Sequence, residues 1–128
     1  MDYRQKPLKT TEFTLAVECC RRAFAASSPG PVEKLAAAVR DRVGDEVDIM
    51  TDFHGRPDSL DAAIAYIKAI EPIKPLFCEE VIQPGDTAAM ADIARRVDCP
   101  LATGERLFTP REFAEVAETR AVAYVQPD

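Results

Sequence analysis

The sequence has no long hydrophobic run and little positive charge. No stretch approaches the roughly 18 apolar residues that a membrane span needs, and the first residues lack the apolar core of a signal peptide. Among the 128 residues, 16 Lys and Arg stand against 22 Asp and Glu, which gives a formal net charge of -6 at pH 7. Nucleic acids and anionic membranes both require a basic surface. We therefore expect neither of them as a partner.

The sequence also lacks cysteine pairs of the metal-binding type and has little histidine. The four cysteines contain no C-x-x-C pair, and the adjacent Cys19 and Cys20 would make a poor disulfide framework. Reduced thiols in a cytoplasmic protein are the expected state. His54 is the only histidine. The Asp-x-His-Gly string that contains it also opens the site of metallophosphoesterases, but those enzymes need several further His ligands that this chain lacks.

The sequence does contain four short apolar runs, each of which ends in an acidic residue. The runs cover residues 47–52, 75–79, 100–105 and 121–128. Their last carboxylates lie 27, 26 and 23 residues apart, about the length of one strand plus one helix with two short loops. Because the carboxyl ends of parallel strands form one rim, we expect these carboxylates to converge there. An all-oxygen cluster of this kind favours a hard cation such as Mg²⁺.

Amphipathic segments separate the runs. Apolar residues that recur every three to four positions predict helices over about residues 31–43, 59–70, 87–97 and 110–118. Gly44 suits the end of the first helix. The last helix begins with a capping box of Thr109 and Glu112, with Pro110 at the first helical position. The order βαβαβαβ predicts an α/β fold with a parallel sheet and flanking helices.

The length allows two interpretations of this pattern. A complete (β/α)₈ barrel needs roughly 250 residues, so the chain is either an open four-stranded sheet or part of a longer barrel. We favour the second, because a last strand at 121–128 with no following helix leaves an apolar edge uncovered. Residues 1–29 are unassigned. A helix is expected over about 11–26, as a partner-binding arm or as an ordinary packing helix.

Four motifs occur in order in the part of the chain that follows. They are Asp52-Phe53-His54-Gly55-Arg56, Glu79-Glu80, Gly104-Glu105-Arg106-Leu107-Phe108 and Gln126-Pro127-Asp128. With them, residues 31–128 resemble the mandelate racemase and muconate lactonizing enzyme family of the enolase superfamily, and most closely its galactonate dehydratase-type sugar-acid dehydratases. The resemblance implies that residues 30–128 form part of a (β/α)₈ TIM-type barrel, about strands three to six.

The resemblance also implies roles for individual residues. Asp52, Glu79 and Glu105 match the three Mg²⁺ ligands, and His54 matches the acid that protonates the departing hydroxyl. Asp128 matches the carboxylate that orients a catalytic His on the next strand. The implied reaction removes the proton α to a carboxylate of a sugar acid, Mg²⁺ stabilises the resulting enediolate, and the β-hydroxyl leaves as water. The general base lies outside this chain, so the 128 residues alone are expected to be inactive.

Several alternatives stay open. Glu80 could support the site from behind or join a salt bridge, and Arg56 and Arg106 could bind a substrate carboxylate or pair with a neighbouring one. Val81 stands where the family usually has Pro. The alternative functions are a racemase or cycloisomerase of the same superfamily, or a non-catalytic truncated remnant. The expected partner is a small sugar acid, and whether a full-length parent is a homo-oligomer is left open.

Overall fold

Helices and short strands alternate along the chain as the sequence predicts. The computed structural model describes residues 29–127, so the predicted helix at about 11–26 and Asp128 lie outside the described residues. The helices are α2 (Gly30–Val43), α3 (Leu60–Ile70), α4 (Thr87–Ala94) and α5 (Pro110–Thr119), with a 3₁₀ turn η1 (Glu71–Ile73). The strands are β1 (Met50–Asp52), β2 (Phe77–Glu79), β3 (Leu101–Thr103) and β4 (Tyr124–Val125).

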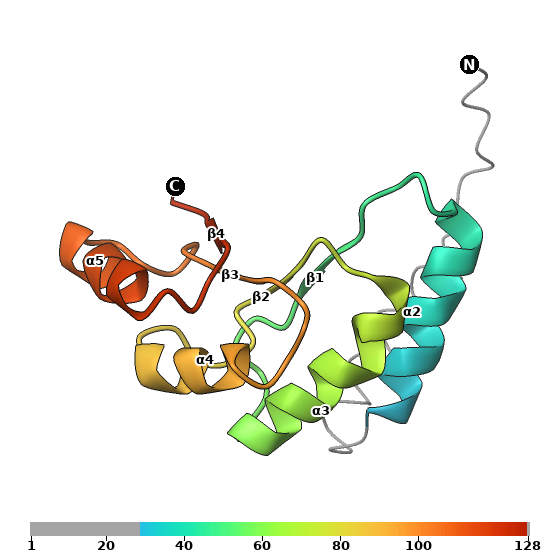
Figure 1. The fold of residues 1–128 in the computed structure, drawn as a ribbon, viewed down its shortest axis with the longest axis horizontal. Coiled ribbons are helices and arrows are strands. Elements are labelled where there is room, and N and C mark those ends of the chain that lie inside the picture. The colour runs from blue at the N-terminus through green and yellow to red at the C-terminus, as the bar shows by residue number, and fades with distance from the viewer. Residues whose placement is uncertain (1–28, 128) are drawn as a thin grey trace.

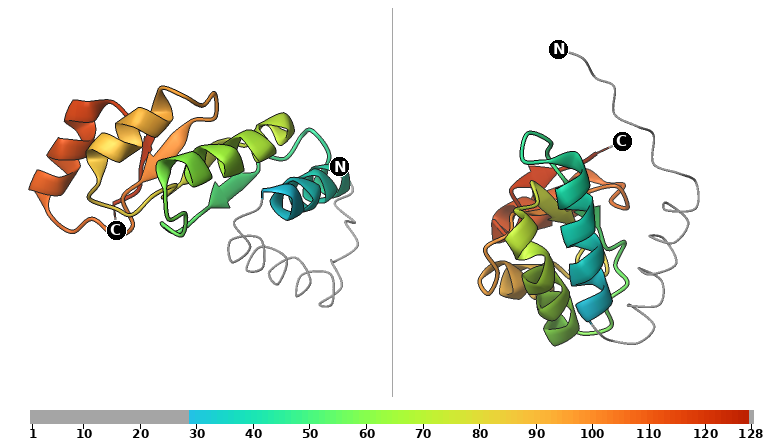
Figure 2. Two further views of the ribbon diagram at one scale, coloured as in Figure 1. Left: turned by 90° about the horizontal axis from the view of Figure 1, so that it is seen from below. Right: turned by 90° about the vertical axis from the view of Figure 1, so that its right-hand side faces the viewer.

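The four strands form one parallel sheet in the order β1-β2-β3-β4. Asp52 pairs with Glu79 in the register of β1 and β2, and Glu79 pairs with Ala102 of β3. Helices α3, α4 and α5 lie along one side of this sheet, and α2 packs beside α3 (Figures 1 and 2). The predicted parallel α/β fold with flanking helices is therefore confirmed.

Local signals in the sequence fix most helix ends. Ser59 caps α3 by accepting a hydrogen bond from the backbone N–H of Ala62, and Gly44 ends α2 with a positive φ of 78°. The predicted capping box at the start of α5 is present. The Thr109 side chain accepts a hydrogen bond from the backbone N–H of Glu112, and the Glu112 side chain accepts one from the backbone N–H of Thr109. One helix end differs from the prediction: α4 ends at Ala94, whereas the sequence predicted a helix to about residue 97. The backbone N–H of Arg96 bonds to the Ile93 carbonyl, three residues back, which tightens the last turn and closes the helix.

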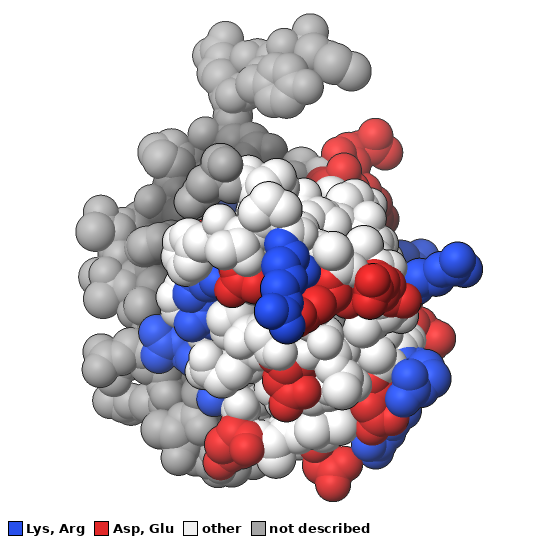
Figure 3. Space-filling model, turned by 90° about the vertical axis from the view of Figure 1, so that its left-hand side faces the viewer, with Lys and Arg blue, Asp and Glu red and all other residues white. Residues whose placement is uncertain are grey.

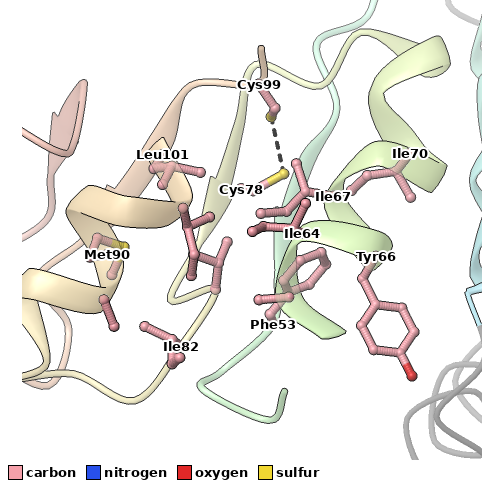
Figure 4. Packing of buried hydrophobic residues seen from close by; sticks show 14 of the residues in the cluster. Phe53, Ile64, Tyr66, Ile67, Ile70, Cys78, Ile82, Met90, Cys99 and Leu101 are labelled. Carbon is pink, nitrogen blue, oxygen red and sulfur yellow. Dashed lines mark hydrogen bonds between the residues drawn. The ribbon is translucent and has the colours of Figure 1, made fainter. Parts of the chain in front are cut away.

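The hydrophobic core lies between the sheet and the helices (Figure 4). Period-two alternation divides each strand between this core and the opposite face of the sheet. Cys78 of β2 and Leu101 of β3 are buried in the core among Ile64 and Ile67 of α3. The neighbours of Cys78 in β2, Phe77 and Glu79, belong to the opposite face.

Charged side chains of both signs are mixed on the surface. On the face nearest α5, Asp and Glu lie interspersed with Lys and Arg (Figure 3). Within residues 29–127, no helix combines the length and apolar character that crossing a bilayer would require.

Candidate metal centre

The end of β1 turns sharply and places two polar side chains together. The Asp52 carboxylate accepts a hydrogen bond from the backbone N–H of His54 at 2.7 Å, and its other oxygen lies 3.4 Å from the His54 imidazole Nδ1. His54 and Gly55 both have positive φ, 52° and 63°. A Cβ on Gly55 would lie 2.6 Å from the Arg106 guanidinium, so both the conformation and the space favour glycine here. Asp52 and His54 are consequently held side by side.

Glu79 stands at the end of β2, on the sheet face away from the helices. Its Oε2 accepts a hydrogen bond from the side-chain amide of Gln126, 3.1 Å away, at the end of β4. Partial burial raises the pKa of Glu79. The Gln126 hydrogen bond acts against this rise, and the negative charges of Asp52, Glu105 and Glu80 add to it. Glu79 is thus electrostatically coupled to the other acidic side chains of the rim.

Glu105 follows β3 through Gly104. A Cβ on Gly104, whose φ is 145°, would meet the backbone nitrogen of Gln126 at 2.6 Å. The absence of a side chain therefore lets the ends of β3 and β4 approach closely. Glu105 itself is exposed at the start of the turn that follows.

Glu80 lies behind the exposed rim and is fully buried. The Arg106 Nε donates a 2.6 Å hydrogen bond to its Oε2, and Nη2 lies equally close but outside hydrogen-bond geometry. This hydrogen bond raises the pKa of Arg106 above its ordinary value. Of the alternatives left open by the sequence, the structure has Glu80 in a salt bridge and Arg106 paired with a neighbouring carboxylate. The Glu80 Oε1 is buried and has no hydrogen-bond partner among the described residues.

Two overlapping groups of ligand atoms can be recognised at this rim. The predicted ligands are Asp52, Glu79 and Glu105. Within residues 29–127, the group whose ligand atoms all lie within 4.8 Å of one another is instead Asp52, His54 and Glu80. Asp52 belongs to both groups, whereas Glu79 and Glu105 lie outside the tighter one.

Charge favours the predicted group over the tighter one. The Glu80 Oε2 is already bonded to a guanidinium, which would repel a cation bound at the same carboxylate. Within residues 29–127, no guanidinium is recorded in a salt bridge with Asp52, Glu79 or Glu105, and carboxylate oxygens are the ligands that Mg²⁺ prefers. The donor set at the rim therefore fits a divalent cation.

Sequence reasoning missed two amide side chains at the site. Gln126, part of a recognised motif, was given no role, yet it bonds to Glu79. The Gln83 side-chain amide donates a 2.7 Å hydrogen bond to the Gly55 carbonyl and so fixes the turn after β1. Neither role has a local signal, because the partners are 47 and 28 residues apart in the chain.

A parallel βα sheet with acidic residues at the carboxyl ends of three neighbouring strands is typical of α/β proteins whose functional site lies at that edge. The family model described as Enolase C-terminal domain-like matches residues 14–128, and the chain belongs to this family. The resemblance drawn from the four motifs is thereby confirmed.

Individual relatives agree with this assignment. The chain is 39% identical over 92 residues to D-galactonate dehydratase of Ralstonia nicotianae, covering 72% of this chain and 24% of the relative. It is 35% identical over 118 residues to D-galactonate dehydratase of Variovorax paradoxus, covering 90% of this chain and 31% of the relative. The chain thus spans about a quarter to a third of the curated relatives it matches.

Solved structures show the same fold. A mandelate racemase/muconate lactonizing enzyme from Sulfitobacter sp. superposes with a TM-score of 0.72 at 41% identity, over 76% of this chain and 24% of that one. A member of the enolase superfamily from Salmonella Typhimurium gives 0.73 at 33% identity, over 77% and 25%. The four-stranded sheet is therefore part of a (β/α)₈ TIM-type barrel, as expected.

Proposed function

We propose that these residues form part of a Mg²⁺-dependent hydro-lyase that dehydrates a sugar acid of the galactonate type. The observation that carries the proposal is the placement of Asp52 opposite Glu79 at the ends of β1 and β2, with Glu105 just after the end of β3. Carboxylates that repel one another at the rim of a barrel are a ready cation site. The two relatives named D-galactonate dehydratase supply the substrate class.

The proposal assigns one role to each predicted site residue at the carboxyl ends of the strands. Asp52, Glu79 and Glu105 hold the cation. When bound, Mg²⁺ would act as a Lewis acid that stabilises the negative charge developing as the α-proton is lost. His54 donates a proton to the β-hydroxyl as it leaves, and Asp128 orients a histidine that acts as general base.

The contacts of His54 suit a proton donor. Its Nδ1 lies 3.4 Å from the Asp52 carboxylate and 3.9 Å from the Glu80 carboxylate, so the imidazole is positioned at the rim beside the proposed cation ligands. Its side chain is also about half exposed, 45%. A substrate can therefore reach the ring from the rim.

A racemase or cycloisomerase is the second candidate, because a solved relative at 41% identity carries that family name. The two functions differ in what His54 must do. A racemase needs acid–base groups on both faces of the α-carbon, whereas a dehydratase needs a donor beside the leaving hydroxyl.

The deciding experiment uses a polypeptide of the relatives' full length that contains these residues. We expect His54→Asn to abolish dehydration of galactonate while exchange of the α-proton with solvent deuterium continues, because another residue removes that proton. Asp58→Asn, an exposed substitution just after the same turn at a residue with no role in the proposal, should leave dehydration unchanged. Full dehydration by His54→Asn would contradict the proposed role.

The 128-residue polypeptide supplies a second test. It contains no other histidine that could act as the base while His54 acts as the acid. We expect no turnover of galactonate by this polypeptide, measured as formation of the 2-keto acid product. Turnover at an enzymatic rate would show that the roles have been assigned wrongly.

A further inference from the structure

Two buried thiols face each other across the sheet. Cys78 lies in β2, and Cys99 lies just before β3. Their sulfur atoms are 3.0 Å apart, and both thiols are free (Figure 4). Neither cysteine has a part in the proposed metal centre.

The backbone on both sides of this pair is fixed. The backbone N–H of Cys78 donates a 2.8 Å hydrogen bond to the Pro100 carbonyl. The turn before β3 is held by the Glu71 carboxylate, whose Oε1 accepts hydrogen bonds from the backbone N–H groups of Asp98 at 2.6 Å and Cys99 at 3.3 Å. The two sulfur atoms are therefore neighbours because of the fold, and not because two flexible side chains happen to meet.

The position is compatible with a covalent bond. The register of β2 and β3 pairs Cys78 with Leu101, so Cys99 is the diagonal neighbour of Cys78, and it is the 3.0 Å between the two sulfur atoms that brings the pair within reach of a bond. From 3.0 Å, the sulfur atoms need to approach by only about 1 Å to reach bonding distance.

We propose that Cys78 and Cys99 form a reversible redox pair that closes to an intrachain disulfide when hydrogen peroxide is the oxidant. Each thiol loses its hydrogen, one S–S bond forms, and the peroxide O–O bond breaks to give two molecules of water. The oxidant must be small, because Cys78 is fully buried and Cys99 is 7% exposed. A thiol reductant reverses the reaction.

Closure would tie β2 to the start of β3 across a separation of 21 residues that includes α4. A cross-link of this length removes conformational freedom from the unfolded chain and so stabilises the fold. Because Cys78 directly precedes Glu79, closure also restrains the strand that carries one of the rim carboxylates. The stability of the fold would thus depend on the redox state of Cys78 and Cys99, which the dehydratase proposal does not require.

The test treats the folded 128-residue chain with hydrogen peroxide, alkylates the remaining thiols under denaturing conditions and maps tryptic peptides. Cys78 falls in the peptide 69–95 and Cys99 in 97–106, so the cross-link joins two separate peptides. We expect this joined pair, about 2 Da lighter than the sum of the reduced peptides. We also expect the joined pair to disappear after dithiothreitol and the melting temperature of the oxidised chain to rise by at least about 5 °C.

Cys99→Ser is the matched control, which should show neither the joined peptides nor the rise in melting temperature. The mapping itself needs no substitution, because disulfides to Cys19 or Cys20 would appear in different peptides. Three results would overturn the proposal: both thiols stay open to alkylation, they oxidise to sulfinic acids without a cross-link, or the cross-link joins two copies of the chain.

Discussion

The buried ion pair behind the metal centre gives the sharpest prediction about stability. The Glu80 side chain is fully buried, and the Arg106 guanidinium lies 2.6 Å from its carboxylate, closer than the His54 imidazole at 3.9 Å. Substituting Arg106→Met removes the positive charge but keeps a side chain that can pack. Glu80 would then be a buried carboxylate without its guanidinium partner, which is strongly unfavourable.

The size of the effect follows from distance and exposure. Two unit charges about 3 Å apart attract by about 5 kcal/mol at an effective dielectric constant of about 20. The Arg106 side chain is 29% exposed, so water screens part of this interaction. We therefore expect Arg106→Met to lower the free energy of unfolding by about 3 kcal/mol, the low end of the range for breaking a buried pair.

Urea unfolding at pH 7 without added metal measures this loss. The matched control is Arg111→Met, because Arg111 pairs with Glu115 on the surface of α5, where its side chain is 88% exposed. The control should cost less than about 0.5 kcal/mol. Adding Glu80→Gln to Arg106→Met should recover at least about 1 kcal/mol, because the unpaired charge is then gone. Equal losses for the two Arg substitutions would refute the reasoning.

Four further substitutions test the close approach of β3 and β4, the capping of α5 and the charge of Glu79. Gly104→Ala should lower the free energy of unfolding by more than about 1 kcal/mol in urea, because an added Cβ meets the Gln126 backbone and φ is positive. Thr109→Ala should cost about 1 kcal/mol of the free energy of unfolding. The Glu112 carboxylate, whose pKa is lowered by its bonds to Thr109 and Phe108, stabilises above its unfolded pKa. This stabilisation should be lost as the pH falls through the lowered pKa of Glu112 in the folded state. The measurement compares the free energy of unfolding of the unsubstituted chain with that of Glu112→Gln as the pH is lowered. Burial raises the pKa of Glu79, so its charge is unfavourable at pH 7, and Glu79→Gln should stabilise the metal-free protein there. That gain should vanish below the unfolded pKa, and a gain independent of pH would contradict this explanation.

Features encoded by neighbouring residues could be predicted from the sequence. The capping box of Thr109 and Glu112 needs only residues three apart, and the structure contains it. The acidic residues could be assigned to strand ends because they recur at the length of one βα unit. Their placement on neighbouring parallel strands follows from chain topology and needs no knowledge of packing.

Features that depend on packing between distant residues could not be predicted. Glu79 and Glu80 are adjacent and chemically identical, yet one reaches the rim and the other is buried against Arg106. Alternation assigns them to different faces but does not show which group compensates the buried charge. The turn before β3 is likewise held by Glu71, whose carboxylate accepts a hydrogen bond from the backbone of Asp98, 27 residues away.

The metal centre as a whole is tested most directly by thermal unfolding of the 128-residue chain with and without Mg²⁺. A cation that binds the folded state alone stabilises it by about 2.7 kcal/mol when its concentration is 100 times the dissociation constant. We predict a rise in melting temperature with Mg²⁺ concentration, lost in Glu79→Gln and Glu105→Gln and kept in Glu118→Gln, an exposed acidic position on α5. No rise with millimolar Mg²⁺ in the unsubstituted chain, or an equal rise in all three variants, would contradict a cation site formed by Asp52, Glu79 and Glu105.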